Sequence, residues 1–128
     1  MGERALLDFV FAEVWQRPGL TRRERRFVTL PCVAAADADQ PLRDHVYAAL
    51  NSGDLSIVEM QETVLHFAVY AGWPKASWFN MVVDEQWERM SQFYASLESG
   101  HTAASAALMR PVPFTGKSRF YRANRELE

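Results

Sequence analysis

Residues 66–76 read His66-Phe67-Ala68-Val69-Tyr70-Ala71-Gly72-Trp73-Pro74-Lys75-Ala76, and this stretch separates two helices. Glycine readily adopts the left-handed backbone conformation that closes many helices, and proline cannot continue a helix that precedes it. Before this turn, Ser56 and Glu59 have the spacing of a capping box, which predicts the start of a helix. After it, apolar residues at helical spacing predict a long helix from Lys75 to about Leu97.

The N-terminal half shows the same helical spacing of apolar residues, with turn signals between the segments. Thr21 and Glu24 form a second capping-box pattern, and Pro31 predicts a kink or an early end in the helix that follows. Neither a repeat nor a strand pattern competes with these helices. The sequence therefore predicts an all-α bundle of about five to six helices, the first three covering residues 3–16, 21 to about 36, and 41–51.

Composition narrows the class of protein. With 128 residues and 48% hydrophobic content, the chain can form one domain with a real core. Fourteen basic against sixteen acidic residues argue against a nucleic-acid partner. The single cysteine, Cys32, excludes an intrachain disulfide, and we interpret it as a small buried residue. Without a signal-peptide pattern or a long apolar run, we expect a soluble, cytoplasmic protein with no membrane contact.

We expect the helical domain to occupy residues 1–100. Residues 101–128 form a basic, aromatic tail that we interpret as an arm on a neighbouring subunit. The expected helix from Lys75 carries a broad apolar face, which includes Trp78, Phe79 and Trp87. Because this face is large for so short a chain, we expect part of it to pack on another subunit.

Candidate chemistry centres on His45, one of three histidines. A helical hairpin would place it opposite Glu62 and His66, which are four residues apart and share a helix face with Tyr70. Histidine has an ordinary pKa close to neutrality, so His45 is a candidate acid/base, and Glu62 could orient it or share its proton. The alternatives are a packed structural histidine, an ordinary surface Glu–His pair, or a weakly supported metal site made of two imidazoles and a carboxylate.

Four arginines crowd the start of the second expected helix, where the helix dipole disfavours positive charge: Arg22, Arg23, Arg25 and Arg26. We expect the first two to face solvent, paired with Asp8 or Glu13. One of the last two is expected to turn inward and hold a substrate carboxylate, because a planar guanidinium offers two parallel hydrogen bonds.

These segments, in their order and spacing, resemble the carboxymuconolactone decarboxylase family from about residue 10 to residue 85. The residues that carry the resemblance are 17–23, 27–30, His45, 49–53, 59–62 and 70–74. The resemblance implies the all-α fold shared with the alkylhydroperoxidase-D-like proteins and a homo-oligomer, either a trimer or a hexamer. It also implies decarboxylation of a small carboxylated lactone, in aromatic-compound catabolism or a related pathway.

One departure separates this chain from the peroxidases of that superfamily. Counting back from His45 places their two cysteines at Ala38 and Pro41, so the thiol that attacks peroxide and the thiol that resolves the sulfenate are both missing. The peroxidase glutamate falls near Arg26. A thiol peroxidase is therefore disfavoured, and Arg26, whose aligned position faces the pocket in those peroxidases, is the preferred carboxylate ligand.

The predicted site has His45 and Glu62 as catalytic residues, and its substrate-binding residues are Arg26, His66, Tyr70 and Trp73. We expect no cofactor and no metal, because the conjugated lactone of such a substrate accepts the electron pair itself. The alternatives are another acid/base enzyme, such as an isomerase or a biosynthetic lyase, and a catalytically silent oligomeric binding protein.

Overall fold

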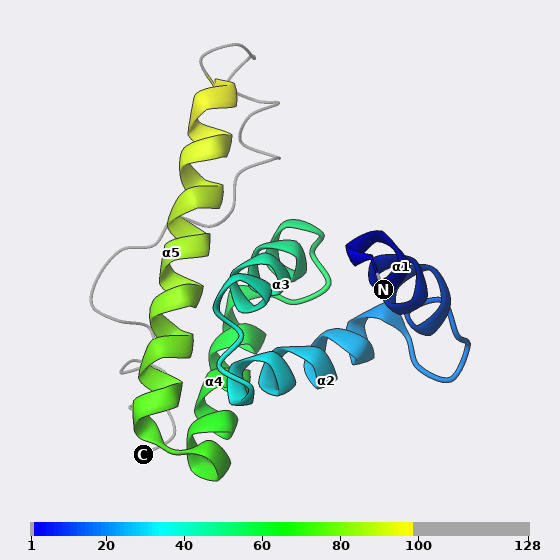
Figure 1. Ribbon diagram of the computed structural model, residues 1–128. Coiled ribbons are helices and arrows are strands. Elements are labelled where there is room, and N and C mark those ends of the chain that lie inside the picture. The colour runs from blue at the N-terminus through cyan, green and yellow to red at the C-terminus, as the bar shows by residue number, and fades with distance from the viewer. Residues whose placement is uncertain (1, 99–128) are drawn as a thin grey trace.

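The computed structural model describes residues 2–98; the tail from residue 101 onward, expected to form an arm, lies outside the described residues. The described chain is helical, which confirms the all-α class (Figure 1). Its elements are α1 (Glu3–Leu7), η1 (Asp8–Val14), α2 (Arg22–Ala35), α3 (Asp39–Asn51), α4 (Ile57–Ala71) and α5 (Trp73–Glu98). None of the helices in this part of the chain is both long and apolar enough to span a membrane.

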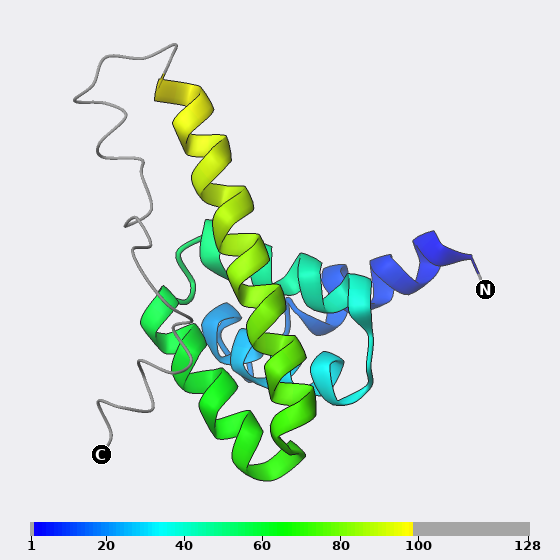
Figure 2. The same cartoon turned by 90° about the vertical axis from the view of Figure 1, so that its left-hand side faces the viewer.

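Helices α2, α3, α4 and α5 all contribute side chains to the core. Figure 2 shows α5 lying across α3 and beside α4, and α2 packs against α3. Phe67 of α4 meets Phe79 of α5 edge-on, with ring centroids 5.5 Å apart. The other large, fully buried side chains are Leu30, Leu42, Leu55, Met60, Val46, Val64, Val82 and Val83.

The apolar face of α5 is mostly covered within the chain, and the expectation that part of it packs on another subunit stays a prediction. Phe79 and Trp87 are buried against the other helices, and Phe93 remains about half exposed. Other exposed apolar side chains lie on the N-terminal segment and on the outer face of α4, and they include Leu6, Leu7, Phe9, Val58, Val69 and Tyr70.

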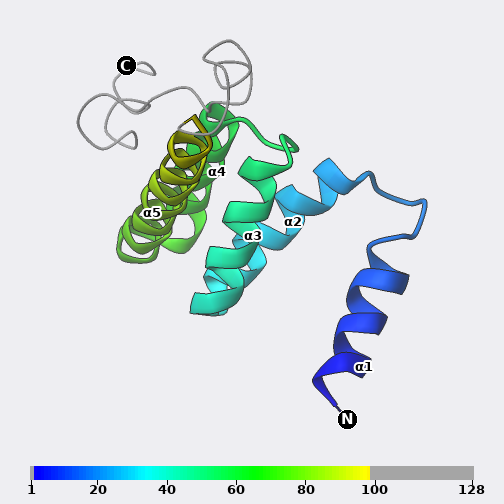
Figure 3. The same ribbon diagram turned by 90° about the horizontal axis from the view of Figure 1, so that it is seen from above.

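The N-terminal segment, residues 3–14, is one continuous helical stretch that lies apart from the α3–α5 core (Figure 3). Its second half is a π-helix: the backbone N–H of Trp15 bonds to the carbonyl of Val10, five residues back, at 2.9 Å. Short π-helical stretches are often found at functional sites. The helix expected over residues 3–16 is present and ends two residues earlier, at Val14, and the sequence does not reveal its wider hydrogen-bond spacing.

Helix α2 begins at the predicted capping box. The amide of Glu24 donates to Thr21 Oγ1 at 3.1 Å, and the amide of Thr21 donates to Glu24 Oε1 at 3.0 Å. The helix continues through Pro31 to Ala35, so an early end at the proline is wrong. Cys32 is exposed rather than buried. Leu30 and Ala34, four residues apart, form the side of α2 that packs into the core, and Cys32 lies on a different side of the helix.

The turn between α4 and α5 forms as expected. Gly72 closes α4 with a φ of 96°, and its amide bonds to the carbonyl of Ala68 at 3.0 Å. Helix α5 starts at Trp73, two residues earlier than expected, because Pro74 is tolerated in the first turn of a helix. At the other end of α4, the hydroxyl of Ser56 accepts the amide of Glu59 at 3.2 Å, as the capping pattern predicts.

Candidate functional site

His45 lies half-buried on α3, beneath two aromatic side chains of the N-terminal region. The Trp15 ring stacks on the imidazole, with centroids 5.9 Å apart and planes inclined by 9°. Phe11 packs 6.1 Å from the same imidazole and 6.0 Å from the Trp15 ring. The π-helix and the residue that follows it therefore form one wall around His45.

Arg26 of α2 also contacts Trp15. Its guanidinium carbon is 5.0 Å from the centroid of the Trp15 ring, a cation–π distance, and its side chain is only 12% exposed. Arg26 Nε donates to Asp54 Oδ2 at 3.2 Å, whereas its two terminal amino groups make no hydrogen bond within residues 2–98. Trp15 is thus in contact with the two residues, His45 and Arg26, that the sequence analysis singled out.

Arg25 does not enter this site. Its Nη2 donates to the backbone carbonyl of Arg17 at 2.8 Å, so Arg25 holds the loop before α2. Of the two arginines considered for the inward position, Arg26 is therefore the one that lies beside His45. We call His45, Arg26, Phe11 and Trp15 the His45 site.

The pKa of His45 is lowered, first by burial and then by the positive charge of Arg26, with Asp44 opposing the shift. The free protein therefore holds the imidazole neutral at pH 7. Within the described residues, neither ring nitrogen of His45 donates or accepts a hydrogen bond. A bound anion would offset the charge of Arg26 and favour the protonated imidazole.

This shift predicts a pH-dependent stability. Unfolded His45 takes up a proton near its ordinary pKa of about 6.5, whereas the folded residue resists protonation, so the unfolded state binds more protons. The free energy of unfolding should consequently fall as the pH drops below about 6.5. We expect the wild type to lose stability relative to His45→Gln between about pH 7 and pH 5, measured by urea denaturation. Parallel pH profiles for the two proteins would contradict this account.

Arg22 and Arg23 are exposed, as expected, but their partners differ from the expected Asp8 and Glu13. Arg22 pairs with Asp54 at 2.7 Å, and Arg23 pairs with Glu59 and donates to the carbonyl of Asp54 at 2.9 Å. The arginines at the start of α2 therefore tie this helix to the loop between α3 and α4 and to the first turn of α4.

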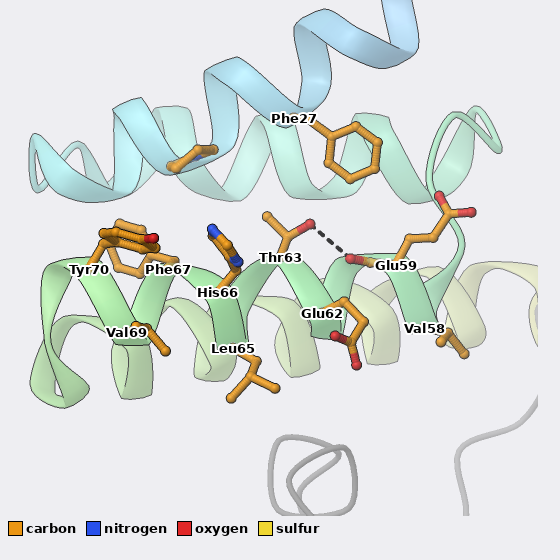
Figure 4. A pocket seen from close by; sticks show the side chains of 11 residues that line it. Phe27, Val58, Glu59, Glu62, Thr63, Leu65, His66, Phe67, Val69 and Tyr70 are labelled. Carbon is orange, nitrogen blue, oxygen red and sulfur yellow. Dashed lines mark hydrogen bonds between the residues drawn. The ribbon is translucent and has the colours of Figure 1, made fainter. Parts of the chain in front are cut away.

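A separate apolar groove runs along the outer face of α4, and we call it the α4 groove (Figure 4). It encloses about 770 Å³, and α2 contributes Phe27 and Pro31 to it. The side chains from α4 are Val58, Glu59, Glu62, Thr63, Leu65, His66, Phe67, Val69 and Tyr70. His66 and Tyr70 pack at 5.1 Å between ring centroids. In Figure 4, His66 points toward α2, whereas the Glu62 carboxylate points away from it.

His45 is not among the residues that line the α4 groove. Glu62 and His66 do share a face of α4, as predicted, but that face is turned to the outside because Met60, Val64 and neighbouring apolar residues occupy the inward side. The structure thus separates His45, which lies against the N-terminal region, from the Glu62–His66 face. Trp73 starts α5 about half exposed and does not line the groove either.

The metal alternative for His45, Glu62 and His66 has no geometric support in the described structure. Among residues 2–98, no three His, Cys, Asp or Glu side chains lie close enough together to hold a metal ion. What the His45 site does present is a neutral imidazole beside a guanidinium whose terminal amino groups have no hydrogen-bond partner within residues 2–98.

A helical bundle with such a pair is equipped to bind a carboxylate and to exchange a proton with it. The chain belongs to the carboxymuconolactone decarboxylase family, whose family model matches residues 3–85. The match includes every residue of the His45 site. No solved structure is significantly similar to the chain.

Two curated relatives are similar to about half of the chain. Nitrosuccinic acid decarboxylase npaB of Metarhizium robertsii is 38% identical over 73 residues, which cover 57% of this chain and 50% of that protein. 4-Carboxymuconolactone decarboxylase of Acinetobacter baylyi is 39% identical over 69 residues, which cover 54% of this chain and 51% of that protein. The chain thus spans about half the length of the curated relatives it matches. Their names indicate a decarboxylase-like enzyme.

Sequence reasoning singled out His45 and Arg26 but not the residues that contact them, Phe11, Trp15 and Asp54. The two aromatic residues are four positions apart in an apolar helical pattern, which looks the same whether it packs on a core or on a functional histidine. Asp54 lies in a loop, and no periodicity indicates which side chains a loop residue contacts.

Proposed function

We propose that this protein is a decarboxylase that removes carbon dioxide from a small carboxylic acid without a cofactor. The observation that carries the proposal is that neutral, half-buried His45 and the inward-facing guanidinium of Arg26 both contact Trp15. The family and the names of both relatives support the reaction type. Both names describe acids with a group, a nitro group or a lactone, that can accept the electron pair left by the departing carboxyl.

In the proposed reaction, Arg26 binds a carboxylate of the substrate through its terminal amino groups. The carbon–carbon bond to the departing carboxylate breaks, carbon dioxide leaves, and the electron pair moves into the adjacent acceptor group. His45 in its protonated form then delivers a proton to the carbon, and a proton from solvent restores it. The net reaction consumes one proton for each carbon dioxide released. Because His45 is only half-buried, solvent can supply this proton to the imidazole.

Aromatic contact also limits the approach to His45. Because the Trp15 ring covers one face of the imidazole, a substrate must reach a ring nitrogen at the edge of His45. The same edge is the part of an imidazole that carries its protons. The stacking is therefore compatible with proton transfer and restricts the angle from which a substrate can enter.

A direct assay tests the proposal. Purified protein is incubated separately with 4-carboxymuconolactone and with nitrosuccinic acid, and carbon dioxide release and product mass are followed against a boiled control. We expect turnover of at least one of the two acids. Binding of both acids without carbon dioxide release would support a silent binding protein, and conversion at unchanged mass would support an isomerase.

We also propose that the protein is a homo-oligomer, a trimer or a hexamer. The support comes from exposed apolar side chains on α4 and on the N-terminal segment, where Val69 is 72% and Phe9 is 56% exposed. A helical bundle of this size gains stability by covering such surfaces with a second copy.

Light scattering should therefore give three or six times the chain mass of 14.6 kDa. Val69→Glu, which puts a charge in the α4 groove, should lower the assembly state with the helical circular dichroism spectrum intact. Met81→Glu is the matched control, because Met81 is an exposed apolar residue of α5 outside the groove. A wild-type protein that is monomeric at micromolar concentration would rule the assembly out.

A further inference from the structure

The loop between α3 and α4 fixes the position of one carboxylate. Gly53 has a φ of 77°, a conformation that glycine adopts at little cost, and it turns the chain after α3. The amide of Asp54 donates to Ser52 Oγ at 3.3 Å, and the Ser52 hydroxyl donates to the carbonyl of Ala49 at the same distance. Leu55, next in the chain, is buried in the core. Asp54 is therefore anchored on both sides.

The Asp54 carboxylate binds two arginines of α2. Arg22 donates from Nε and Nη2 to the two carboxylate oxygens, both at 2.7 Å, and Arg26 donates from Nε to Oδ2 at 3.2 Å. The side chains of Asp54 and Arg26 are only 10% and 12% exposed, whereas Arg22 is 63% exposed. Hydrogen bonds from Arg22 and Arg26 lower the pKa of Asp54, so it remains ionised at neutral pH.

We propose that Asp54 is the positioning residue that orients Arg26 for a substrate carboxylate; this inference rests on the proposed function. The bond to Asp54 occupies Nε of Arg26, and the Trp15 ring covers one face of the guanidinium. Both contacts fix its plane. The two terminal amino groups, Nη1 and Nη2, have no hydrogen-bond partner within residues 2–98. Together they can donate two parallel hydrogen bonds to the two oxygens of a carboxylate.

Arg22 has a distinct part in this arrangement. If Asp54 paired with Arg26 alone, its negative charge would cancel the positive charge that attracts an anionic substrate. With Arg22 bound to the same carboxylate, the group of three keeps a net positive charge. Asp54 thus orients Arg26 while the site still attracts an anion.

The experiment compares Asp54→Asn with Asp39→Asn. Asp39 is the matched control because it also accepts two hydrogen bonds from one arginine, Arg43, but has no contact with Arg26. With the acid that the protein turns over, Asp54→Asn should raise KM about tenfold and change kcat much less, the pattern of lost ground-state binding. Asp39→Asn should leave both constants near the wild-type values.

A double-mutant cycle distinguishes positioning from general damage. In an Arg26→Ala background, Asp54→Asn should cause no further increase in KM, because the residue it orients is gone. An equal increase with and without Arg26 would overturn the proposal. If Asp54→Asn does not fold, Arg22→Gln changes an exposed side chain of the same group and should raise KM only when Arg26 is present.

A second readout does not need turnover. In nuclear magnetic resonance spectra of the free protein, the Nε–H signal of Arg26, identified by its loss in Arg26→Ala, should exchange slowly with water. Asp54→Asn should abolish this protection and Asp39→Asn should not. Persistent protection in Asp54→Asn would overturn the positioning role, whereas absent turnover with normal protection would count against the proposed function alone.

Discussion

His45→Ala is expected to lower kcat by about a hundredfold or more, the usual scale for losing a positioned acid or base. The imidazole is the proposed proton donor to the carbon that loses its carboxyl group. Alanine cannot replace it, and the ring faces of Phe11 and Trp15 supply no acidic proton. KM should change far less, because Arg26 remains in place to bind the carboxylate. The measurement is steady-state kinetics with the acid that the wild type turns over.

Two comparison variants make this result specific to His45. His66→Ala removes an imidazole from the α4 groove, which the structure separates from the His45 site. If His66→Ala is as damaging as His45→Ala, the groove is part of the active site. Glu62→Ala tests the other acid/base candidate: near-normal turnover in His45→Ala with a large loss in Glu62→Ala would transfer the role to Glu62. Circular dichroism and gel filtration must first show that each variant is folded and assembled.

Arg26→Ala is expected to raise KM by about tenfold to a hundredfold, the range for one to two hydrogen bonds to a charged group. The guanidinium would hold the carboxylate in both the ground state and the transition state, so its loss appears mainly in KM rather than in kcat. Arg26→Lys should give an intermediate KM, since it keeps the charge but cannot make two parallel hydrogen bonds.

Arg25→Ala is the matched control for this measurement. Arg25 precedes Arg26 on α2, but its Nη2 binds the carbonyl of Arg17 instead of contributing to the His45 site. We expect its KM to remain near the wild-type value. A fall in kcat with unchanged KM in Arg26→Ala would instead mean that Arg26 stabilises charge formed only in the transition state.

The sequence was sufficient for the helices because local chemistry determines their ends. Thr21 with Glu24, Ser56 and Gly72 each satisfy or close a helix terminus through groups a few residues away. Pro31 shows the limit of such reasoning, since its local penalty predicted a disruption that the packed helix tolerates. The energy gained by burying Leu30 and Ala34 supports α2 on both sides of the proline.

The site was only partly predictable because it depends on how the helices are oriented. Spacing showed that Glu62 and His66 share a face, but it did not show that this face lies outside the bundle and away from His45. The wall formed by Phe11 and Trp15 depends on a π-helical spacing that has no sequence signature here. His45 could be proposed because the chain has only three histidines, and Arg26 because its position aligns with the pocket glutamate of the related peroxidases.

The π-helix makes the position of Phe11 sensitive to single-residue changes in the length of the N-terminal segment. In a π-helix each backbone hydrogen bond spans five residues, one more than in an α-helix. Deleting one residue between Asp8 and Val14 would restore α-helical spacing and rotate everything before the deletion by about 100° relative to Trp15. Trp15 would stay on His45 while Phe11, if it preceded the deletion, would turn away from the imidazole. A single residue deleted from this segment or inserted into it would therefore change the aromatic surroundings of His45 and leave the contact between Trp15 and His45 in place.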